Sequence, residues 1–345
     1  MTDIFKEVET DILIVGAGPV GLFAVFECGM LKMRTHVVDV LDMPGGQCSA
    51  LYPEKPIYDI PAHPSLTGQA LVDNLLEQIA PFQPTWHLGQ QVMGLRKDEA
   101  AQTFIVETSK GTRITCKAII IAAGAGAFGP KKPPLEDLEK YEDKCVFYYV
   151  KKRSDFKDKH LVIAGGGDSA VDWAVSLSEI AASVKVVHRR NKFRCAPDSE
   201  EKLRSLAQSG KVDLVIPYQL AALEGDDNGH LKAVHVETLE GEQRSLIADM
   251  LLPFYGLATS LGPLAKWGLA LDRTTITINP TTGETSMPGV FAVGDVAGYD
   301  HKLKLILTGF SESAQAAHAA YKYVFPGQAL HFEHSTTSGV QNLKK

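Results

Sequence analysis

Two glycine-rich turns in this chain have the residue types and spacing that bind the phosphate groups of a dinucleotide. The first occupies residues 16–21 (GAGPVG) and the second residues 165–170 (GGGDSA). Each follows four apolar residues that predict a strand, ILIV at 12–15 and LVIA at 161–164. In that context the glycines allow a tight turn, and the N–H groups of the following helix point at a pyrophosphate. The sequence therefore predicts two dinucleotide sites.

The residue that would contact the ribose differs between the two turns. Asp39 stands 23 residues after the first glycine, at the end of the strand predicted over 35–38. A carboxylate there accepts hydrogen bonds from ribose hydroxyls and repels a 2′-phosphate. His188 stands at the same distance in the second turn and is followed by Arg189 and Arg190, whose guanidinium groups suit a 2′-phosphate. The first site is therefore predicted to take the ADP half of FAD and the second to take NADPH.

Two further segments support the FAD site. Residues 285–295 (TSMPGVFAVGD) predict a short strand that ends in Gly-Asp, from which Asp295 can reach the ribityl chain of a flavin. Residues 118–124 (AIIIAAG) predict a buried strand that ends in small residues. Ordinary α/β strands also end in this way, and a single glycine turn can serve packing alone. The four signals indicate nucleotide binding because they occur together and in this order.

Composition limits the class of protein. A length of 345 residues suits two domains, and a hydrophobic content of 45% is typical of a globular protein. The net charge of −6 argues against general nucleic-acid binding. No apolar run approaches the roughly 18 residues that span a bilayer, and the first residues lack the pattern of a signal peptide. We expect a cytoplasmic protein with no nucleic-acid or membrane partner.

The cysteines indicate neither a dithiol nor a metal site. The five residues lie at least 20 positions apart, so there is no CxxC: Cys28, Cys48, Cys116, Cys145 and Cys195. Cys48 follows Gly45-Gly46-Gln47, where some flavin disulfide reductases place the first cysteine of a pair. Their second cysteine would fall at Pro53. We expect reduced thiols and no bound metal.

The order of predicted elements places one nucleotide domain inside the other. The predicted segments are a β–α–β unit over about 12–40, a Pro-, Gly- and Tyr-rich loop at 43–65, a helix at 66–81, a β meander at 86–121, a second nucleotide fold up to about 252 and a helix at 309–323. We expect the α/β class with two Rossmann-like, three-layer domains. The FAD-binding domain would comprise residues 1–126 and 257–345, and the NADPH-binding domain residues 127–256. Two crossings between them would form a hinge.

The chain resembles the low-molecular-weight thioredoxin reductases over nearly its whole length. It departs from them in two places, since residues 143–150 contain no CxxC and the chain continues past the point where they usually end. Both departures resemble the thioredoxin-reductase-type ferredoxin–NADP reductases. The loop at 45–61, the HRR sequence at 188–190 and the tail at 332–338 are similar to that family too. The resemblance covers about residues 10–340.

The resemblance implies roles for individual residues. The expected FAD contacts are Gly16, Gly18 and Gly21 at the pyrophosphate, Asp39 at the ribose, Val92 near the adenine, Gln47 at the isoalloxazine edge, Phe128 beside the flavin and Asp295 at the ribityl chain. Tyr52 is expected to stack on one face of the ring. His334 and Thr336 are expected to close the other face, from either subunit of a homodimer. The expected NADPH contacts are Gly165, Gly167, Asp168, Ser169, Ala170, His188, Arg189, Arg190 and Arg194.

The implied activity is FAD-mediated electron transfer between NADPH and a small iron–sulfur ferredoxin. No acid–base pair is expected, because hydride transfer to a flavin depends on stacking and on exclusion of water. The basic residues expected to dock ferredoxin are Lys131, Lys132, Lys151, Lys152, Arg153, Lys157, Lys159, Lys302 and Lys304. Two alternatives stay open: an NADPH-dependent flavin reductase for a quinone, a dithiol protein or oxygen, and a redox sensor without turnover. The alternative for the polar tail is a disordered appendage.

Overall fold

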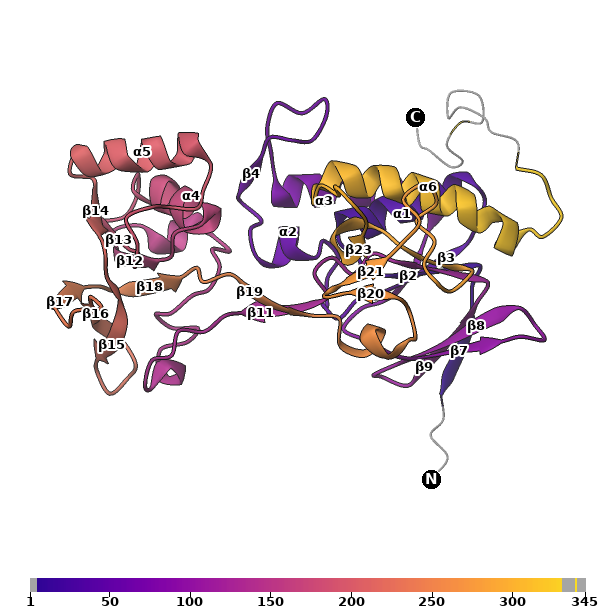
Figure 1. The fold of residues 1–345 in the computed structure, drawn as a ribbon, viewed down its shortest axis with the longest axis horizontal. Helices are drawn as coiled ribbons and strands as arrows, with labels where there is room; N and C mark the ends of the chain where they lie inside the picture. Colours follow the sequence, from indigo (N-terminus) through magenta and orange to yellow (C-terminus); the bar gives the residue numbers. More distant parts are fainter. Residues whose placement is uncertain (1–4, 331–338, 340–345) are drawn as a thin grey trace. The chain divides into compact units, whose positions relative to one another are not determined.

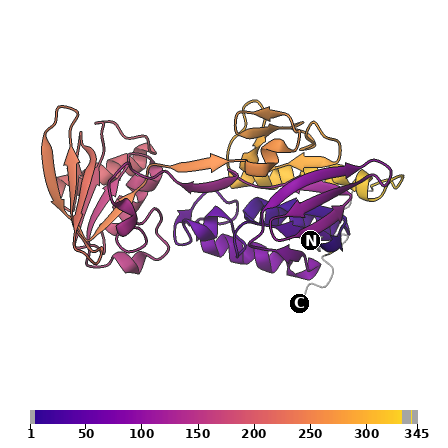
Figure 2. The same ribbon diagram turned by 90° about the horizontal axis from the view of Figure 1, so that it is seen from below.

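The computed structural model describes residues 5–330 and residue 339 and divides into two units. Unit 1 comprises Met1–Phe128 and Thr259–Lys345, and unit 2 comprises Gly129–Ala258. Each boundary lies two residues from the one expected from the sequence. The chain passes between the units through β11 (Ala127–Pro130) and β19 (Leu257–Ser260), which pair with each other (Figures 1 and 2).

Unit 1 is built on a five-stranded parallel sheet in the order β22-β10-β2-β3-β6. The strands are β2 (Ile12–Val15), β3 (Thr35–Val38), β6 (Thr85–His87), β10 (Ala118–Ile121) and β22 (Val290–Ala292). Every residue of β2, β10 and β22 is buried. A parallel sheet is covered on both faces, so its central strands are apolar throughout, as the runs in this sequence are.

Alternate side chains of these strands point into two different cores. Ile12 and Ile14 pack with three helices, and Leu13 and Val15 pack with an antiparallel meander on the other face. The helices, which Figure 1 shows together, are α1 (Pro19–Met30), α3 (Gly68–Ile79) and α6 (Ile306–Val324). The meander strands are β7 (Val92–Asp98), β8 (Thr103–Thr108) and β9 (Thr112–Cys116), and β1 (Lys6–Glu9) pairs with β9. Unit 1 therefore has three layers.

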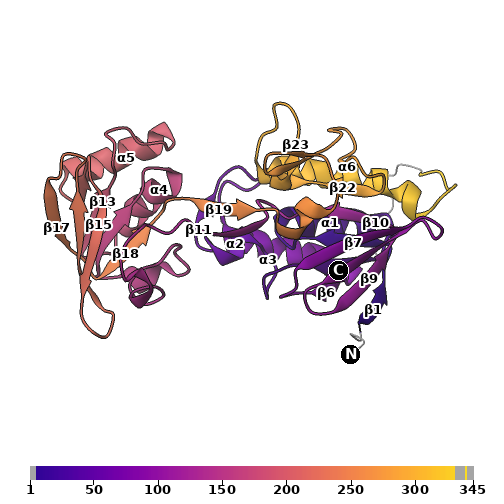
Figure 3. The ribbon, with the colours of Figure 1, turned by 60° about the horizontal axis from the view of Figure 1, so that its bottom comes forward.

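Unit 2 repeats this plan on a smaller scale. Its parallel sheet has the order β14-β13-β12-β18, formed by β12 (His160–Ala164), β13 (Ser183–Val187), β14 (Val212–Val215) and β18 (Met250–Pro253). Leu161 and Ile163 pack with the helices, and Val162 and Ala164 face the meander. The helices are α4 (Asp168–Leu177) and α5 (Pro197–Gln208), and the meander strands are β15 (Gln219–Gly225), β16 (Leu231–Glu237) and β17 (Gln243–Ile247) (Figure 3).

The expected fold class, α/β with two Rossmann-like units, is confirmed. Short elements complete it: α2 (Gln47–Ala50), β4 (Pro56–Ile57), β5 (Leu66–Thr67), β20 (Leu271–Asp272), β21 (Thr275–Thr277), β23 (Ala297–Gly298) and 3-10 turns at Ala80–Phe82, Leu138–Lys140, Arg153–Phe156, Gly262–Lys266 and Gly294–Val296. None of the helices in the described part of the chain combines the length and the apolar character needed to span a bilayer.

Candidate nucleotide-binding sites

The first glycine turn joins β2 to α1, and its three glycines meet different surroundings. A Cβ added to Gly16 (φ +110°) would lie 2.3 Å from the carbonyl oxygen of Ala122, and one added to Gly21 would lie 1.9 Å from the carbonyl oxygen of Gly16. Packing therefore requires both glycines. A Cβ on Gly18, the N-cap of α1, would have only the Gly46 Cα nearby, at 3.9 Å. A side chain at Gly18 would therefore fill space beside the helix N-terminus in which a ligand could bind.

A cavity of about 270 Å³ in unit 1 opens on this turn. It brings together most of the residues expected at the FAD site, namely Gly16, Gly18, Asp39, Gln47, Tyr52, Val92 and Asp295. Gly21 is not among its lining residues, because it packs against the turn itself. The side chain of Phe128 and the whole of His334 and Thr336 lie outside the described residues.

Asp39 is fixed at the end of β3 by backbone N–H groups. Its Oδ2 accepts a hydrogen bond from the N–H of Ala17 (2.6 Å), and its Oδ1 accepts one from the N–H of Leu41 (2.8 Å). Burial raises the pKa of this carboxyl group, and the backbone hydrogen bonds oppose that rise. A carboxylate has about four acceptor positions, so Asp39 can hold its place in the turn and still accept ribose hydroxyls.

The loop that carries Gln47 and Tyr52 is docked on the same turn. The N–H of Gly45 (φ +116°) donates to the carbonyl of Ala17 at 2.8 Å, and α2 begins at Gln47, beside the cavity. The Cys48 thiol lies 3.7 Å from the Tyr52 hydroxyl. Burial raises the pKa of Cys48 to about 11 and also raises that of Tyr52. Both groups are therefore neutral near pH 7, and the thiol is not activated as a nucleophile.

A buried charge cluster behind the cavity was not expected from the sequence. Glu312, in the middle of α6, accepts hydrogen bonds from the N–H of Gly294 (2.7 Å), the hydroxyl of Tyr299 (2.8 Å) and the ammonium group of Lys302. The Lys302 side chain is only 6% exposed, so its expected role in docking ferredoxin is wrong. One signal in the sequence could have indicated that Glu312 is buried. Glu312 lies three residues after Gly309 and four before Ala316, which share the buried face of α6.

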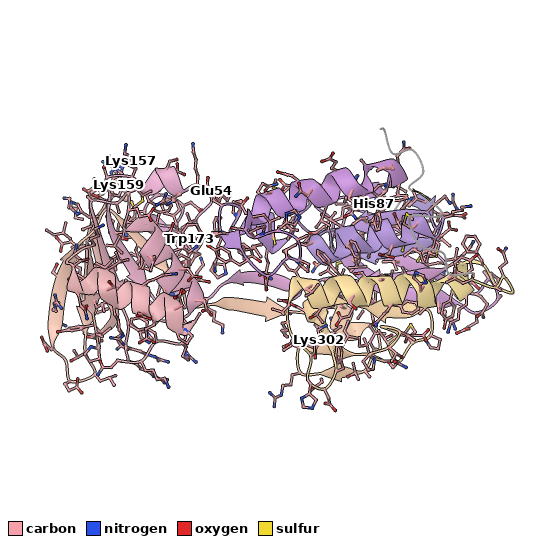
Figure 4. All side chains as sticks on the ribbon, turned by 90° about the horizontal axis from the view of Figure 1, so that it is seen from above. Glu54, His87, Lys157, Lys159, Trp173 and Lys302 are labelled. Carbon is pink, nitrogen blue, oxygen red and sulfur yellow. The ribbon has the colours of Figure 1, made fainter. Side chains whose placement is uncertain are left out.

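The other basic residues expected at a docking surface fall into two groups. Lys132, although exposed, pairs with Glu142 at 2.6 Å, and the half-buried Arg153 pairs with Glu179. The remaining ones are exposed: Lys131, Lys151, Lys152, Lys157, Lys159 and Lys304. Figure 4 labels Lys157 and Lys159 on unit 2 and Lys302 on unit 1.

The second glycine turn joins β12 to α4. A Cβ added to Gly165 would lie 2.7 Å from the carbonyl oxygen of Phe254. One added to Gly166 would lie 2.3 Å from the ring of His188. Gly167, the N-cap of α4, would meet only the Arg194 carbonyl, at 3.8 Å. As in the first turn, the N-cap glycine is the position at which the protein itself leaves room for a side chain.

The other residues expected at the second turn are divided between surface and core. Asp168 and Ser169 are exposed in the first turn of α4, and Asp168 Oδ1 accepts the N–H of Ala196 at 2.9 Å. Ala170 is buried beneath the turn. The N–H of Arg194 donates to the carbonyl of Gly166 at 2.6 Å. These contacts hold the segment around residue 194 beside the glycines.

Three arginines carry the guanidinium groups that are expected to bind a 2′-phosphate. Arg189, Arg190 and Arg194 are exposed, and none of them forms an ion pair with another described residue. The His188 ring stacks on Phe193, with centroids 5.2 Å apart. Burial lowers the pKa of His188, and the three arginines lower it further. Three exposed positive charges with no ion-pair partner among the described residues could therefore bind an anion here, and the His188 imidazole is neutral at pH 7.

The fold and the two turns define a class: a two-unit α/β protein with a nucleotide turn in each unit. The family model of the pyridine nucleotide-disulphide oxidoreductases matches residues 10–322, and the chain belongs to this family. The family resemblance expected from the sequence is thereby confirmed.

Similar proteins were found by sequence and by structure. The chain is 61% identical to the ferredoxin–NADP reductase of Paramagnetospirillum magneticum over 332 residues, which cover 96% of this chain and 98% of that protein. It is 58% identical to the enzyme of the same name from Rhodospirillum rubrum, with 97% of each chain covered. A Lactococcus lactis thioredoxin reductase superposes with a TM-score of 0.76 at 25% identity, covering 91% of this chain and 99% of the other.

Proposed function

We propose that this chain is an FAD-dependent ferredoxin–NADP reductase, which transfers electrons between NADPH and a small iron–sulfur ferredoxin. The observation that carries the proposal is the contrast between the two ribose positions. A fixed carboxylate, Asp39, stands beside the first turn, and three arginines without an ion-pair partner among the described residues stand beside the second. Relatives that are 51–61% identical and named ferredoxin–NADP reductase support the acceptor.

The residues of the unit 1 cavity fit FAD. Gly18 leaves its backbone open to a pyrophosphate, Asp39 supplies acceptors for a ribose, and Asp295 supplies one for a ribityl chain. Gln47 and Tyr52 lie on the same cavity and would contact the ring. When bound there, FAD would take a hydride from NADPH and pass electrons on singly, as an iron–sulfur acceptor requires.

The chain's own residues orient the nucleotides and exclude side reactions. The neutral Cys48 thiol and Tyr52 hydroxyl place no charge against the ring. All five cysteines are free, and their spacing offers no dithiol through which electrons could pass to a disulfide. In unit 2, Arg189, Arg190 and Arg194 would hold the 2′-phosphate and select NADPH over NADH. His334 and Thr336 stay predicted to cover the second face of the ring.

Exposed lysines of unit 2 support electrostatic docking of an acidic ferredoxin. Lys151, Lys152, Lys157 and Lys159 lie within nine residues of one another and are exposed. Exposed charges steer association across a Debye length of about 8–10 Å. We therefore expect the second-order rate constant with ferredoxin to fall as salt rises. A rate constant independent of salt would argue against docking by these residues.

A steady-state assay with NADPH and the host's own ferredoxins tests the function. We expect NADPH oxidation to saturate with ferredoxin and to exceed the rates with oxygen or a quinone at least about tenfold, a difference of 1.4 kcal/mol. Equal rates with all acceptors would instead indicate a general flavin reductase. Slow reduction of the flavin by NADPH, with no transfer to any acceptor, would indicate a sensor.

The assembly and the location of the protein stay predictions. A homodimer and a cytoplasmic location are expected from the resemblance and from the sequence respectively. Sedimentation velocity of the FAD-loaded protein would test the first, and a sedimentation coefficient of a single chain across micromolar concentrations would contradict it.

A further inference from the structure

Glu312 is a buried carboxylate that does not itself line the cavity. It is 2% exposed and lies on the face of α6 with Gly309, Ser313 and Ala316. A carboxylate in such a place is stable only if it is paired and hydrogen-bonded. Three donors meet this need, and each comes from the segment that precedes α6 in the sequence.

The three donors belong to the segment that forms one end of the cavity. Gly294 directly precedes Asp295, and Lys302 lies two residues before Lys304, the first of three consecutive residues that line the cavity. Tyr299 lies between them. Glu312 therefore links the middle of α6 to the two cavity-lining stretches, residues 294–295 and 304–306. Glu312 itself does not line the cavity.

Close packing would pass a movement of Gly294 on to the cavity. A Cβ on Gly294 (φ +73°) would lie 3.3 Å from Val20 Cγ1, and one on Gly309 would lie 2.4 Å from Val20 Cγ2 and 3.3 Å from the Gly294 Cα. Val20 itself lines the cavity. With so little free space around Val20, loss of the hydrogen bond to Gly294 would shift Asp295 rather than be absorbed locally.

We propose that Glu312, paired with Lys302, is a positioning residue for the cofactor site of unit 1. It holds Gly294 and thereby Asp295, and it fixes the segment from Lys302 to Ile306 at the cavity edge. The proposal rests on the proposed FAD site, and it assigns Glu312 no contact with FAD. Its consequence is that the affinity and the spectrum of bound FAD depend on a carboxylate outside the cavity.

A second cluster in unit 1 provides a matched control. Glu284 accepts the N–H of Gly289 (3.0 Å) and the hydroxyl of Tyr323 (2.5 Å), and Lys322 lies 3.8 Å away. The donor types are the same as at Glu312, and α6 again takes part. The Lys322 side chain is 64% exposed, compared with 6% for Lys302, and no residue of this cluster lines the cavity.

The test compares FAD-loaded wild type with the variants Glu312→Gln, Lys302→Met, the double variant and the control Glu284→Gln. The measurements are the FAD dissociation constant, the flavin absorption spectrum and the melting temperature. We expect Glu312→Gln to weaken FAD binding about tenfold, the effect of losing a hydrogen bond to a charged group, and to shift the flavin absorption band. Lys302→Met should weaken FAD binding more than Glu312→Gln does, because it leaves the Glu312 carboxylate without its cation. The double variant should weaken FAD binding less than Lys302→Met.

The control decides between positioning and simple stabilisation. Glu284→Gln should lower the melting temperature and leave FAD affinity and spectrum at wild-type values. If Glu312→Gln behaves in the same way, Glu312 has only a structural role and the proposal is wrong. If Glu312→Gln does not fold, Tyr299→Phe removes one donor, and an unchanged FAD affinity and spectrum in that variant would also overturn the proposal. Failure of the wild type to bind FAD would instead overturn the proposed function.

Discussion

The two glycine turns share one backbone plan and differ in what surrounds it. In both, the N-cap glycine of the following helix, Gly18 or Gly167, has space for a Cβ within the protein. In the first turn backbone oxygens leave no room for a Cβ at Gly16 or Gly21, and in the second the His188 ring leaves none at Gly166. Within one motif, packing therefore requires some of the glycines, and space for a ligand requires another.

The residues at the two expected ribose positions also differ in how firmly the protein holds them. Asp39 is enclosed and its two oxygens already accept backbone N–H groups, so its geometry is set before any nucleotide binds. Arg189, Arg190 and Arg194 are exposed and form no ion pair within the described chain, so no protein partner fixes their guanidinium groups. Under the proposed function, this difference suits an FAD that stays bound at the first site and an NADPH that enters and leaves the second.

Alanine at two glycines of the first turn should separate an effect on stability from an effect on FAD binding. Gly21→Ala places a methyl group 1.9 Å from a backbone oxygen, so the turn must shift. We expect a loss of about 1–3 kcal/mol in the free energy of unfolding and weaker FAD binding with it. Gly18→Ala should keep the wild-type stability and weaken FAD binding about 10- to 100-fold, because the added methyl group would displace the pyrophosphate from about one charge-assisted hydrogen bond. Denaturant unfolding and FAD titration separate the two outcomes.

Gly167→Ala is the matched control in the second turn. It should leave both stability and FAD affinity unchanged and raise the KM for NADPH. Tight FAD binding by Gly18→Ala, equal to that of the wild type, would show that the first turn does not hold the pyrophosphate.

The next effect concerns the choice between NADPH and NADH. Replacement of Arg189 and Arg190 by alanine should lower kcat/KM for NADPH about 10- to 1,000-fold, since a charge-assisted hydrogen bond contributes roughly 1.5–3 kcal/mol. NADH turnover should change little. Assays with a small artificial electron acceptor measure the activity with NADPH and with NADH in the absence of ferredoxin. The control replaces Lys157 and Lys159, which removes the same charge elsewhere on unit 2 (Figure 4). A preference for NADPH that survives the arginine substitutions would refute the ribose assignment.

The local features of both turns could be predicted from the sequence, and the buried charge cluster could not. Strand runs, glycine turns and the ribose positions depend on residues within about 25 positions of one another. The pair of Lys302 and Glu312 depends on how the segment before α6 folds back on that helix, and a lysine in a polar loop otherwise indicates solvent. The last helix begins at Ile306, three residues before its expected start at about Gly309. Gly309 lies inside α6, where Val20 leaves no room for a Cβ.

The smallest expected effect is a pH dependence of stability in unit 1. The Nε2 of His87 and the Nδ1 of His36 lie 3.1 Å apart on neighbouring strands, and the N–H of Asp39 donates to the His87 carbonyl at 3.2 Å. Burial, with a contribution from His87 and then Arg34, lowers the pKa of His36 from 6.5 to about 4. Between these values the unfolded chain binds more protons than the folded one, so stability falls as the pH drops through that range.

The variant His36→Gln should flatten this dependence, because glutamine keeps a polar group and does not titrate. Urea unfolding at several pH values between about 7 and about 4 measures how the free energy of unfolding changes with pH. This range spans the two pKa values given above. His301→Gln, at an exposed histidine, is the control and should keep the wild-type slope. An unchanged slope in His36→Gln would show that the histidine pair is not its source.

In the proposed function unit 1 holds FAD, unit 2 holds NADPH, and electrons pass from the flavin to a ferredoxin. This function is tested most directly by anaerobic mixing of the FAD-loaded protein with NADPH while the flavin absorption is followed. The account predicts rapid bleaching by NADPH, slow bleaching by NADH and rapid recovery of the absorption on addition of oxidised ferredoxin. Equally fast bleaching by both nucleotides, or a reduced flavin that ferredoxin does not reoxidise, would contradict it.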